Sequence, residues 1–218
     1  MKHLLIIIII IIAIIIVWSC EKKGPKIVNE PTNKIVVGIQ GFGNINKTLL
    51  DTIKSTFEEF YGYKVILFEG KPIPKSAFIN IKSPRYRADS ILKILKREKP
   101  TSADFVIGFL DKDISVTKRD SQGKILKPEF KYADWGVLGL GYRPGPVCVI
   151  STHRMKTANR HKFIERLKKI AVHELGHNLG LKHCNSNTKC VMRDAAETVK
   201  TIDFVDLKLC EKCQSSIN

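Results

Sequence analysis

The sequence predicts an α+β fold with a mixed β-sheet, a long helix in its second half and a small helical or irregular C-terminal part. Two observations lead to this prediction. Between residues 34 and 110, short apolar runs alternate with segments of helical apolar spacing, and beyond residue 157 one long helical pattern precedes irregular sequence. The 218 residues, 44% of them hydrophobic, are enough for one domain with a buried core, and the composition excludes a disordered chain.

Strand and helix patterns alternate through the first half. Residues 34–41 are expected to form a strand, and residues 45–61 follow with apolar side chains at helical spacing. Residues 64–68 are a short apolar second strand. After a stretch punctuated by prolines, residues 86–98 carry apolar side chains among lysines and arginines, which predicts an amphipathic helix that Pro100 ends. Residues 104–110, DFVIGFL, complete this half as a third buried strand.

The second half begins with a long polar connection over residues 111–131. Residues 135–140 and 147–151 are expected to be strands, and the Gly- and Pro-rich turn between them favours antiparallel or edge pairing. Residues 157–179 have the spacing of a long helix, with Leu167 and Leu175 on its buried stripe. No internal repeat accompanies these elements.

An apolar run near the N-terminus predicts export. Residues 4–18 contain no polar side chain, and Lys2 precedes them. An uncleaved helix of that length would reach only about 22 Å, less than the roughly 30 Å of a bilayer core, so the run suits a signal peptide. The run ends in Val-Trp-Ser-Cys, which resembles the lipobox of bacterial lipoproteins, where cleavage leaves a lipidated Cys20 as the new terminus. An uncleaved signal anchor, including one that faces the cytoplasm, is the alternative.

These segments give the expected domain organisation. Residues 1–20 are predicted to be a signal peptide or lipoprotein anchor, residues 21–34 a polar tether, and residues 35–218 the folded domain. The expected location is membrane-anchored, in the periplasm or on the cell surface. The net charge of +16 favours anionic partners, but with only two tryptophans and five tyrosines the chain lacks the stacking residues of a nucleic-acid binder, so no nucleic acid is expected.

Three of the six histidines fall within the eleven residues 173–183, HELGHNLGLKH. On a helix, His173 and His177 lie one turn apart and can bind one Zn²⁺. Gly180 permits the left-handed turn that ends the helix and lets the chain return with His183 as a third ligand. Three imidazoles leave one zinc position open for catalysis, and Glu174 is placed beside it to act as general base. Surface histidines without a shared function are the alternative.

This pattern, HExxHxxGxxH followed by a methionine nine residues later, resembles the metzincin signature. The resemblance implies a metzincin-type mixed sheet with an active-site helix, and it implies that Met192 sits in a tight turn beneath the zinc. An ordinary core methionine is the alternative for Met192 taken alone.

Four cysteines follow the histidine motif: Cys184, Cys190, Cys210 and Cys213. A C-x-x-C pair with two further cysteines can supply the four thiolates of a closed structural zinc site. Two disulfides are the alternative, because an exported protein permits them. Cys148 lies in an apolar run and is expected in the core.

Taken together, the run HELGHNLGLKHC…CVM…CEKC resembles the archaemetzincin family, whose members carry a catalytic zinc and a Cys₄ zinc in adjacent sequence. The seventeen residues between Met192 and Cys210 fit that family's spacing, while five residues separate Cys184 from Cys190 where the usual pattern has four. The resemblance implies a compact zinc metallopeptidase with two zinc ions per chain.

The sequence therefore predicts zinc-dependent peptide-bond hydrolysis with Glu174 as general base, by a membrane-tethered monomer that acts on peptides or proteins. An extended substrate is expected to pair with an edge strand around residues 135–142. Two other functions remain open. One is a non-catalytic zinc-binding surface module that holds a protein or an anionic partner. The other is dinucleotide binding by the glycine-rich turn at residues 41–46, in which Asn46 replaces the third glycine.

Overall fold

The computed structural model describes residues 34–194 and 198–217, and Lys34–Asn218 form one compact unit. The predicted signal peptide or anchor, Cys20 and most of the tether lie outside the described residues. Within the part of the chain that is described, no helix is both long enough and apolar enough to cross a bilayer.

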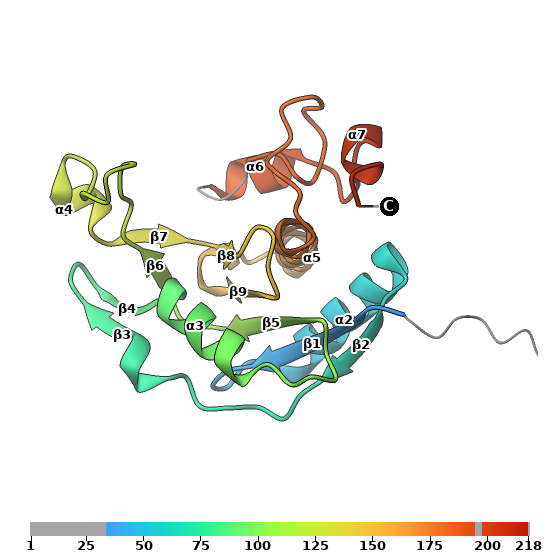
Figure 1. Ribbon diagram of the computed structural model, residues 1–218, viewed down its shortest axis with the longest axis horizontal. Helices are drawn as coiled ribbons and strands as arrows, with labels where there is room; N and C mark the ends of the chain where they lie inside the picture. The colour runs from blue at the N-terminus through green and yellow to red at the C-terminus, as the bar shows by residue number, and fades with distance from the viewer. Residues whose placement is uncertain (1–33, 195–197, 218) are drawn as a thin grey trace, which may run out of the picture. The chain divides into compact units, whose positions relative to one another are not determined.

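A five-stranded sheet forms the centre of this unit (Figure 1). Its strands are ordered β2 (Lys64–Leu67), β1 (Val36–Gly41), β5 (Phe105–Leu110), β9 (Val147–Ser151) and β8 (Gly139–Gly141). The first four run parallel, and β8 pairs antiparallel with β9. The predicted strands at 34–41, 64–68, 104–110 and 147–151 are confirmed, and β8 lies at an edge of this sheet.

Helices cover both faces of the sheet. α2 (Lys47–Tyr61) and α5 (Arg160–Asn178) pack on one face, where alternate strand residues such as Ile39 and Ile107 point. α3 (Ala88–Glu98) packs on the other face with Val106 and Val149. Because strand side chains alternate between faces, the nearly continuous apolar runs of β5 and β9 are what a sheet buried on both sides requires.

The turn from β1 into α2 is explained by helix capping. The Asn46 side chain accepts a hydrogen bond from the backbone N–H of Thr48 at 2.8 Å, so Asn46 is the N-cap of α2. An asparagine at this position satisfies an N–H group that the helix leaves without a partner. The residue that departs from the dinucleotide-binding pattern therefore has a structural role, and the helix ends at Gly62 with a left-handed φ of 68°.

A second, four-stranded sheet was not expected. Its order is β3 (Phe78–Asn80), β4 (Pro84–Arg87), β6 (Ile114–Val116) and β7 (Trp135–Val137). The prediction of one long connection over 111–131 was therefore wrong, because β6 and the start of α4 (Glu129–Tyr132) lie within it. The helix predicted from residue 86 begins at Ala88, and the run 135–140 is divided between β7 in this sheet and β8 in the larger one.

Ion pairs explain why this sheet escapes a search for apolar patterns. Arg85 on β4 is 2.9 Å from the carboxylate of Asp113 and 3.3 Å from that of Asp134. The side chain of Asp134 is fully buried and that of Asp113 is 10% exposed. Charged residues, whose presence in a sequence predicts an exposed loop, are thus buried here as ion pairs. In addition, strands of three residues are too short to show the alternation of apolar and polar side chains that identifies a strand.

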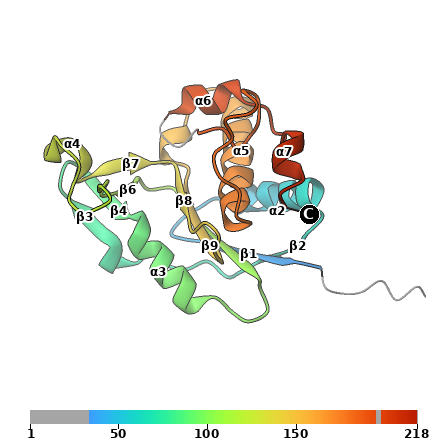
Figure 2. The same cartoon turned by 45° about the horizontal axis from the view of Figure 1, so that its top comes forward.

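The chain beyond α5 forms the helical and irregular C-terminal part that was predicted. It contains α6 (Val199–Phe204) and α7 (Glu211–Gln214), and its buried residues form a small core of their own beneath Val172 of α5. α6 lies against α5 (Figure 2). A bidentate ion pair between Arg166 of α5 and Asp203 of α6, with both N–O distances at 2.7 Å, joins this part to the long helix. Two 3₁₀ turns, η1 (Lys75–Ala77) and η2 (His153–Met155), complete the described elements.

Candidate metal centre

The long helix α5 supplies the first two histidines. It begins at the N-cap Asn159, and its last turns are almost entirely buried between the large sheet and the C-terminal part. It ends at Asn178, and in the turn that follows Gly180 has a φ of +98° and the N–H of Leu181 donates to the carbonyl of Gly176 at 2.9 Å. This glycine-terminated turn reverses the chain, as the sequence predicted, and returns it toward the helix.

The three histidines of the motif converge. Metal-binding atoms of His173, His177 and His183 all lie within 4.8 Å of one another. Their ring centroids are 4.6 to 5.4 Å apart. His173 and His177 are buried, whereas the His183 side chain is 34% exposed, so the cluster reaches solvent on the side of His183.

Backbone carbonyls orient two of these rings. Nδ1 of His173 is 2.8 Å from the carbonyl oxygen of Val191, and Nδ1 of His177 is 2.7 Å from that of Leu181. A carbonyl only accepts, so we assign the proton of each ring to Nδ1, which leaves the Nε2 lone pair free. Nε2 of His173 is a buried atom without a hydrogen-bond partner. A buried orphan nitrogen beside two other imidazoles is the donor set that zinc requires.

Burial also keeps these histidines in the form that binds metal. Burial, with a smaller contribution from the neighbouring His177, lowers the pKa of His173 to about 3. Burial lowers the pKa of His177 in the same direction. Both imidazoles are therefore neutral at pH 7, and a neutral ring is the one that offers a lone pair to a cation.

Glu174 follows His173 directly in the active helix and is 3% exposed. Burial raises the pKa of its carboxyl to about 8. A cation at the histidine cluster would favour the ionised form, because opposite charge at short range lowers a carboxyl pKa. Glu174 can therefore exchange a proton near neutral pH, which a general base and acid must do.

Edge strand β8 passes directly over the Glu174 side chain. A methyl group built at Gly139 would lie 2.5 Å from Oε1 of Glu174 and 2.7 Å from its Cδ, closer than atoms can approach. Only glycine leaves room for the carboxylate there. Gly139 could not be identified from the sequence, because a glycine in a strand does not indicate which side chain packs against it.

Met192 is fully buried under the active helix. A methyl group built at Gly176 would lie 2.5 Å from the Met192 sulfur, so the methionine packs closely against the helix backbone between the first two histidines. The Met192 carbonyl accepts from the N–H of Cys184 at 2.8 Å. The segment around Met192 thus packs against the part of the helix that carries His173 and His177.

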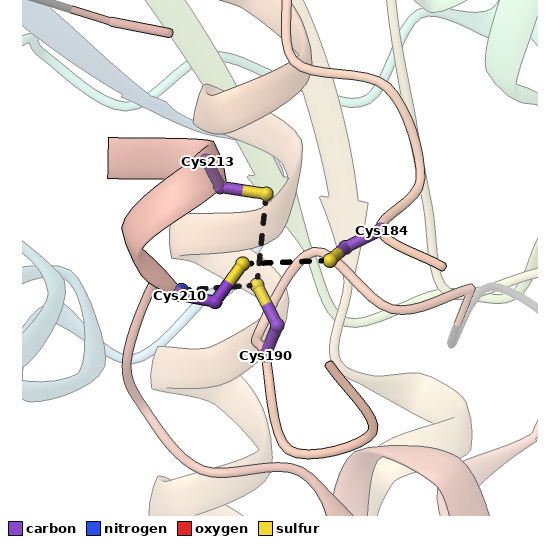
Figure 3. Close-up of side chains that lie close together, drawn as sticks. All are labelled: Cys184, Cys190, Cys210 and Cys213. Atoms are coloured by element: carbon purple, nitrogen blue, oxygen red, sulfur yellow. Dashed lines mark hydrogen bonds between the residues drawn. The ribbon is translucent and has the colours of Figure 1, made fainter. Parts of the chain in front are cut away.

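The four cysteines of the C-terminal part form a second cluster (Figure 3). Their sulfurs all lie within 4.8 Å of one another, with Cys184 to Cys210 at 3.6 Å and Cys190 to Cys213 at 3.8 Å. Cys213 comes from α7 and Cys210 caps it, while Cys184 and Cys190 come from the chain that follows α5. Cys190 joins the cluster although the spacing before it is one residue longer than the family pattern.

These distances fit a tetrahedral metal better than disulfides. All five described cysteines are free, and a disulfide would bring two sulfurs to about 2.05 Å. A tetrahedron with Zn–S bonds of about 2.3 Å has sulfurs about 3.8 Å apart. Burial opposes ionisation of Cys184, yet backbone N–H groups of Asn187 and Ser186 lower the pKa of its thiol to about 7, toward the thiolate that binds metal. Cys148 is fully buried in the core, as expected.

Comparison with known proteins shows the family of the chain. The model for the family described as "Peptidase family M54" matches residues 30–218. The chain belongs to peptidase family M54. The archaemetzincin of Natronomonas pharaonis is 30% identical over 190 residues, which are 83% of this chain and 98% of the relative. That of Methanocaldococcus jannaschii is 31% identical over 181 residues, which are 80% of this chain and 88% of the relative.

Solved structures agree with the family. The archaemetzincin of Archaeoglobus fulgidus, crystallised with malonate, is 27% identical with a TM-score of 0.66 and covers 84% of this chain and 100% of its own. The archaemetzincin of Methanopyrus kandleri has a TM-score of 0.70 at 22% identity, over 87% of this chain and 97% of its own, and shows the shared fold. As a member of family M54 with archaemetzincin relatives, the chain is a zinc metallopeptidase that acts on peptides or proteins.

Two other histidines and a nearby aspartate do not take part in the histidine cluster. His153 and His161 are exposed and outside the histidine cluster. Asp113 is paired with Arg85 and Arg154. Two further polar groups at the site were missed. Asn178, 2% exposed, donates to the carbonyls of Tyr142 and Val147 and so ties the β8–β9 turn to α5, and Asp194 lies 3.6 Å from Nδ1 of His183.

Proposed function

We propose that this chain hydrolyses peptide bonds at a zinc ion held by His173, His177 and His183, with Glu174 as the proton-transferring group. The observation that carries the proposal is the buried, unpartnered Nε2 of His173 in a cluster of three imidazoles, with the buried carboxyl of Glu174 at the next position of the helix. A structural zinc site is usually closed by four protein ligands, whereas three histidines leave a position for substrate or water.

The chemistry follows from these side chains. His173, His177 and His183 would hold a zinc ion, which would supply a Lewis acid for the scissile carbonyl and make the attacking water more acidic. Glu174 accepts the proton of the attacking water and delivers it to the amine that leaves, a role that suits a carboxyl with a pKa near neutrality. Hydrogen bonds from the two Nδ1–H groups to the carbonyls of Val191 and Leu181 keep the rings oriented throughout.

We propose that β8 holds the substrate. It is an edge strand, and Gly139 lies against Glu174. An extended peptide that adds to this edge gains main-chain hydrogen bonds and passes beside the general base. Asn178 supports the strand from behind through its two bonds to the β8–β9 turn, which keeps the edge at a fixed distance from the helix that carries the ligands.

The second proposed zinc is structural and is held by the four cysteines. Four thiolates close the coordination sphere, so this ion has no position for substrate. Its function is to join α7 to the segment that follows α5, because the C-terminal part has only a small core. The proposed content of the chain is therefore two zinc ions with different roles.

Replacement of Glu174 by glutamine tests the catalytic proposal. Glu174→Gln keeps the side chain's size but removes the base, so we expect hydrolysis of a mixed peptide library to fall at least 10²-fold while zinc content stays at two per chain. Glu165→Gln, in the same helix but paired with Lys168, is the matched control and retains activity. A Glu174→Gln protein that cleaves at the wild-type rate, or a wild type that binds zinc and cleaves nothing, would contradict the proposal.

We further propose that the chain is a membrane-tethered monomer, lipidated at Cys20 and located in the periplasm or on the cell surface. The support is the sequence of residues 1–20 alone: a fifteen-residue apolar run followed by a lipobox-like cysteine. Cys20→Ser should block fatty-acid labelling of the chain in a bacterial host, whereas Cys148→Ala should not. Equal labelling of the two variants would contradict lipidation at Cys20.

A further inference from the structure

Three consecutive residues connect the two clusters. Cys190 contributes a sulfur to the cysteine cluster, Val191 offers its carbonyl to Nδ1–H of His173, and Met192 packs beneath Gly176 of the active helix. All three are buried, with 2%, 1% and 0% of their surface exposed. The residue that orients a catalytic histidine is thus the immediate neighbour of a cysteine in the second cluster.

The same segment is fixed on its other side by the cysteine-bearing chain. The N–H of Val191 donates to the carbonyl of Lys208 at 2.9 Å, two residues before Cys210. The carbonyl of Met192 accepts from the N–H of Cys184 at 2.8 Å, and the N–H of Cys210 lies 3.4 Å from the sulfur of Cys190. Every backbone contact that holds Val191 and Met192 in place therefore involves a cysteine of the cluster or a residue close to one.

A second connection runs through the sequence itself. His183 and Cys184 are adjacent, so one dipeptide carries the third imidazole of the first cluster and a sulfur of the second. The second histidine differs in this respect. Nδ1–H of His177 donates to the carbonyl of Leu181, four residues along the same turn of chain, and no cysteine takes part in that contact.

We propose that the metal-loaded cysteine cluster sets the zinc affinity of the histidine cluster, with Val191 as the positioning residue that couples them. The inference rests on the proposed two-zinc content and goes beyond it. Without a metal, four thiols from two chain segments do not hold these segments together, and the Val191 carbonyl loses its fixed position. A histidine ligand whose outer hydrogen bond is lost typically binds metal 10–100-fold more weakly.

Metal binding at either cluster should strengthen metal binding at the other, and the effect should reach His173 but not His177. By thermodynamic linkage, zinc at the histidine cluster tightens metal binding at the cysteine cluster by the same factor. His173 and His183 depend on the cysteine-bearing segment, whereas His177 depends on its own turn. Emptying the cysteine cluster should therefore release the Nδ1 hydrogen bond of His173 and leave that of His177 intact.

The first experiment uses the unmodified metal-free protein. One equivalent of Cd²⁺ per chain, which prefers thiolates, fills the cysteine cluster, and its thiolate charge-transfer absorption reports occupancy. Competition with a chelator then gives the zinc affinity of the remaining site, with and without Cd²⁺. We expect zinc to bind 10–100-fold more tightly when Cd²⁺ is present. Equal affinities within twofold, or a failure of the cysteines to bind Cd²⁺ or Zn²⁺ at all, would overturn the proposal.

A second measurement guards against general unfolding. In ¹⁵N-labelled protein with zinc at the histidine site, the ring nitrogens of each histidine report its tautomer and its hydrogen bond. In Cys213→Ser we expect the His173 signals to change and those of His177 to remain, while Cys148→Ala, which removes a buried thiol outside the cluster, changes neither. Equal perturbation of both histidines in Cys213→Ser would refute a path through Val191.

The two proposals can fail separately. The metal affinities and histidine signals are measured without substrate, so an inactive protein with coupled sites would contradict the peptidase mechanism alone. A protein that cleaves peptides through Glu174 but shows independent metal sites would contradict the coupling alone.

Discussion

Gly139→Ala tests whether β8 sets the position of the general base. The added methyl group would lie 2.5 Å from Oε1 of Glu174, 2.7 Å from Cδ and 2.8 Å from Cγ. Ordinary contact between such atoms begins near 3.4 Å, so the carboxylate must move by roughly 1 Å or the strand must shift away from the helix. The three atoms nearest to this methyl group all belong to Glu174 and none to a histidine, so zinc should still bind.

The magnitude follows from the geometry. A misplacement of about 1 Å in a reacting group typically costs about 10²-fold in rate, which corresponds to about 2.7 kcal/mol of transition-state stabilisation. The methyl group points toward Glu174 rather than toward the free edge of the strand, so we expect the loss in kcat with KM changed by less than threefold. Initial rates on a fluorogenic peptide, measured with zinc content on the same samples, give both quantities.

Gly70→Ala is the matched control, because no atom lies within 4 Å of a methyl group built at Gly70 and its φ is not positive. We expect it to retain wild-type kcat. If Gly139→Ala kept kcat within twofold while folding and binding zinc normally, Glu174 would not be held against β8 during catalysis, and the argument for this strand as the substrate edge would lose its main support.

Three further predictions concern stability and metal. Hydrogen bonds from Arg166 lower the pKa of Asp203 to about 2, below its ordinary value of 3.8. The ionised pair therefore stabilises the fold above about pH 4, and this contribution is lost as the pH falls toward 2. In urea unfolding, Asp203→Asn should lower the free energy of unfolding by about 1 kcal/mol at pH 7, after allowance for solvent screening, and should not change it at pH 2. Gly176→Ala should lower the free energy of unfolding by about 1 kcal/mol in the same assay, because overpacking against Met192 outweighs the gain in helix propensity. A variant more stable than the wild type would show that the Met192 side chain moves to make room for the methyl group. In the Cys20→Ser variant, chelation should expose four additional thiols to a chromogenic disulfide reagent without unfolding the large sheet, while Cys148 stays protected in its core until denaturant is added. A fifth rapid thiol in that variant would mean that the core had opened.

The large sheet could be predicted because its strands are buried on both faces. Residues 104–110 and 147–151 are nearly continuous apolar runs, and helices with a clear apolar stripe alternate with them. The small sheet lacks this signal. Arg85, Asp113 and Asp134 are buried in it as a charge network, and the pairing of β4 with β6 joins residues that a whole helix and a strand separate in sequence. Nothing local in the sequence indicates that such distant charges will meet.

In the candidate site, too, some groups could be predicted from the sequence and others could not, and the reason is chemical. Metal ligands and proton-transfer groups need particular side chains, so the histidines, Glu174 and the cysteines could be named from residue type and spacing. The groups that orient them need no particular side chain. Val191 and Leu181 act through carbonyls that any residue would supply, and Gly139 acts by having no side chain at all. These contacts are properties of the fold.

The segment around Val191 should tolerate a change of side chain better than a change of chain length. If Val191 acts only through its backbone, Val191→Ile, which keeps a buried β-branched side chain, should leave the His173 hydrogen bond intact, whereas a one-residue deletion between Val191 and Cys210 should break it. Exposed positions in this segment, such as Lys200, are then free to vary, whereas its length must bring the Lys208 carbonyl to the Val191 N–H and Asp203 must keep its ion pair with Arg166. The spacing between Met192 and Cys210 should therefore matter for the histidine cluster, because the backbone contact between Val191 and Lys208 depends on it although the segment between them contains none of the three histidines.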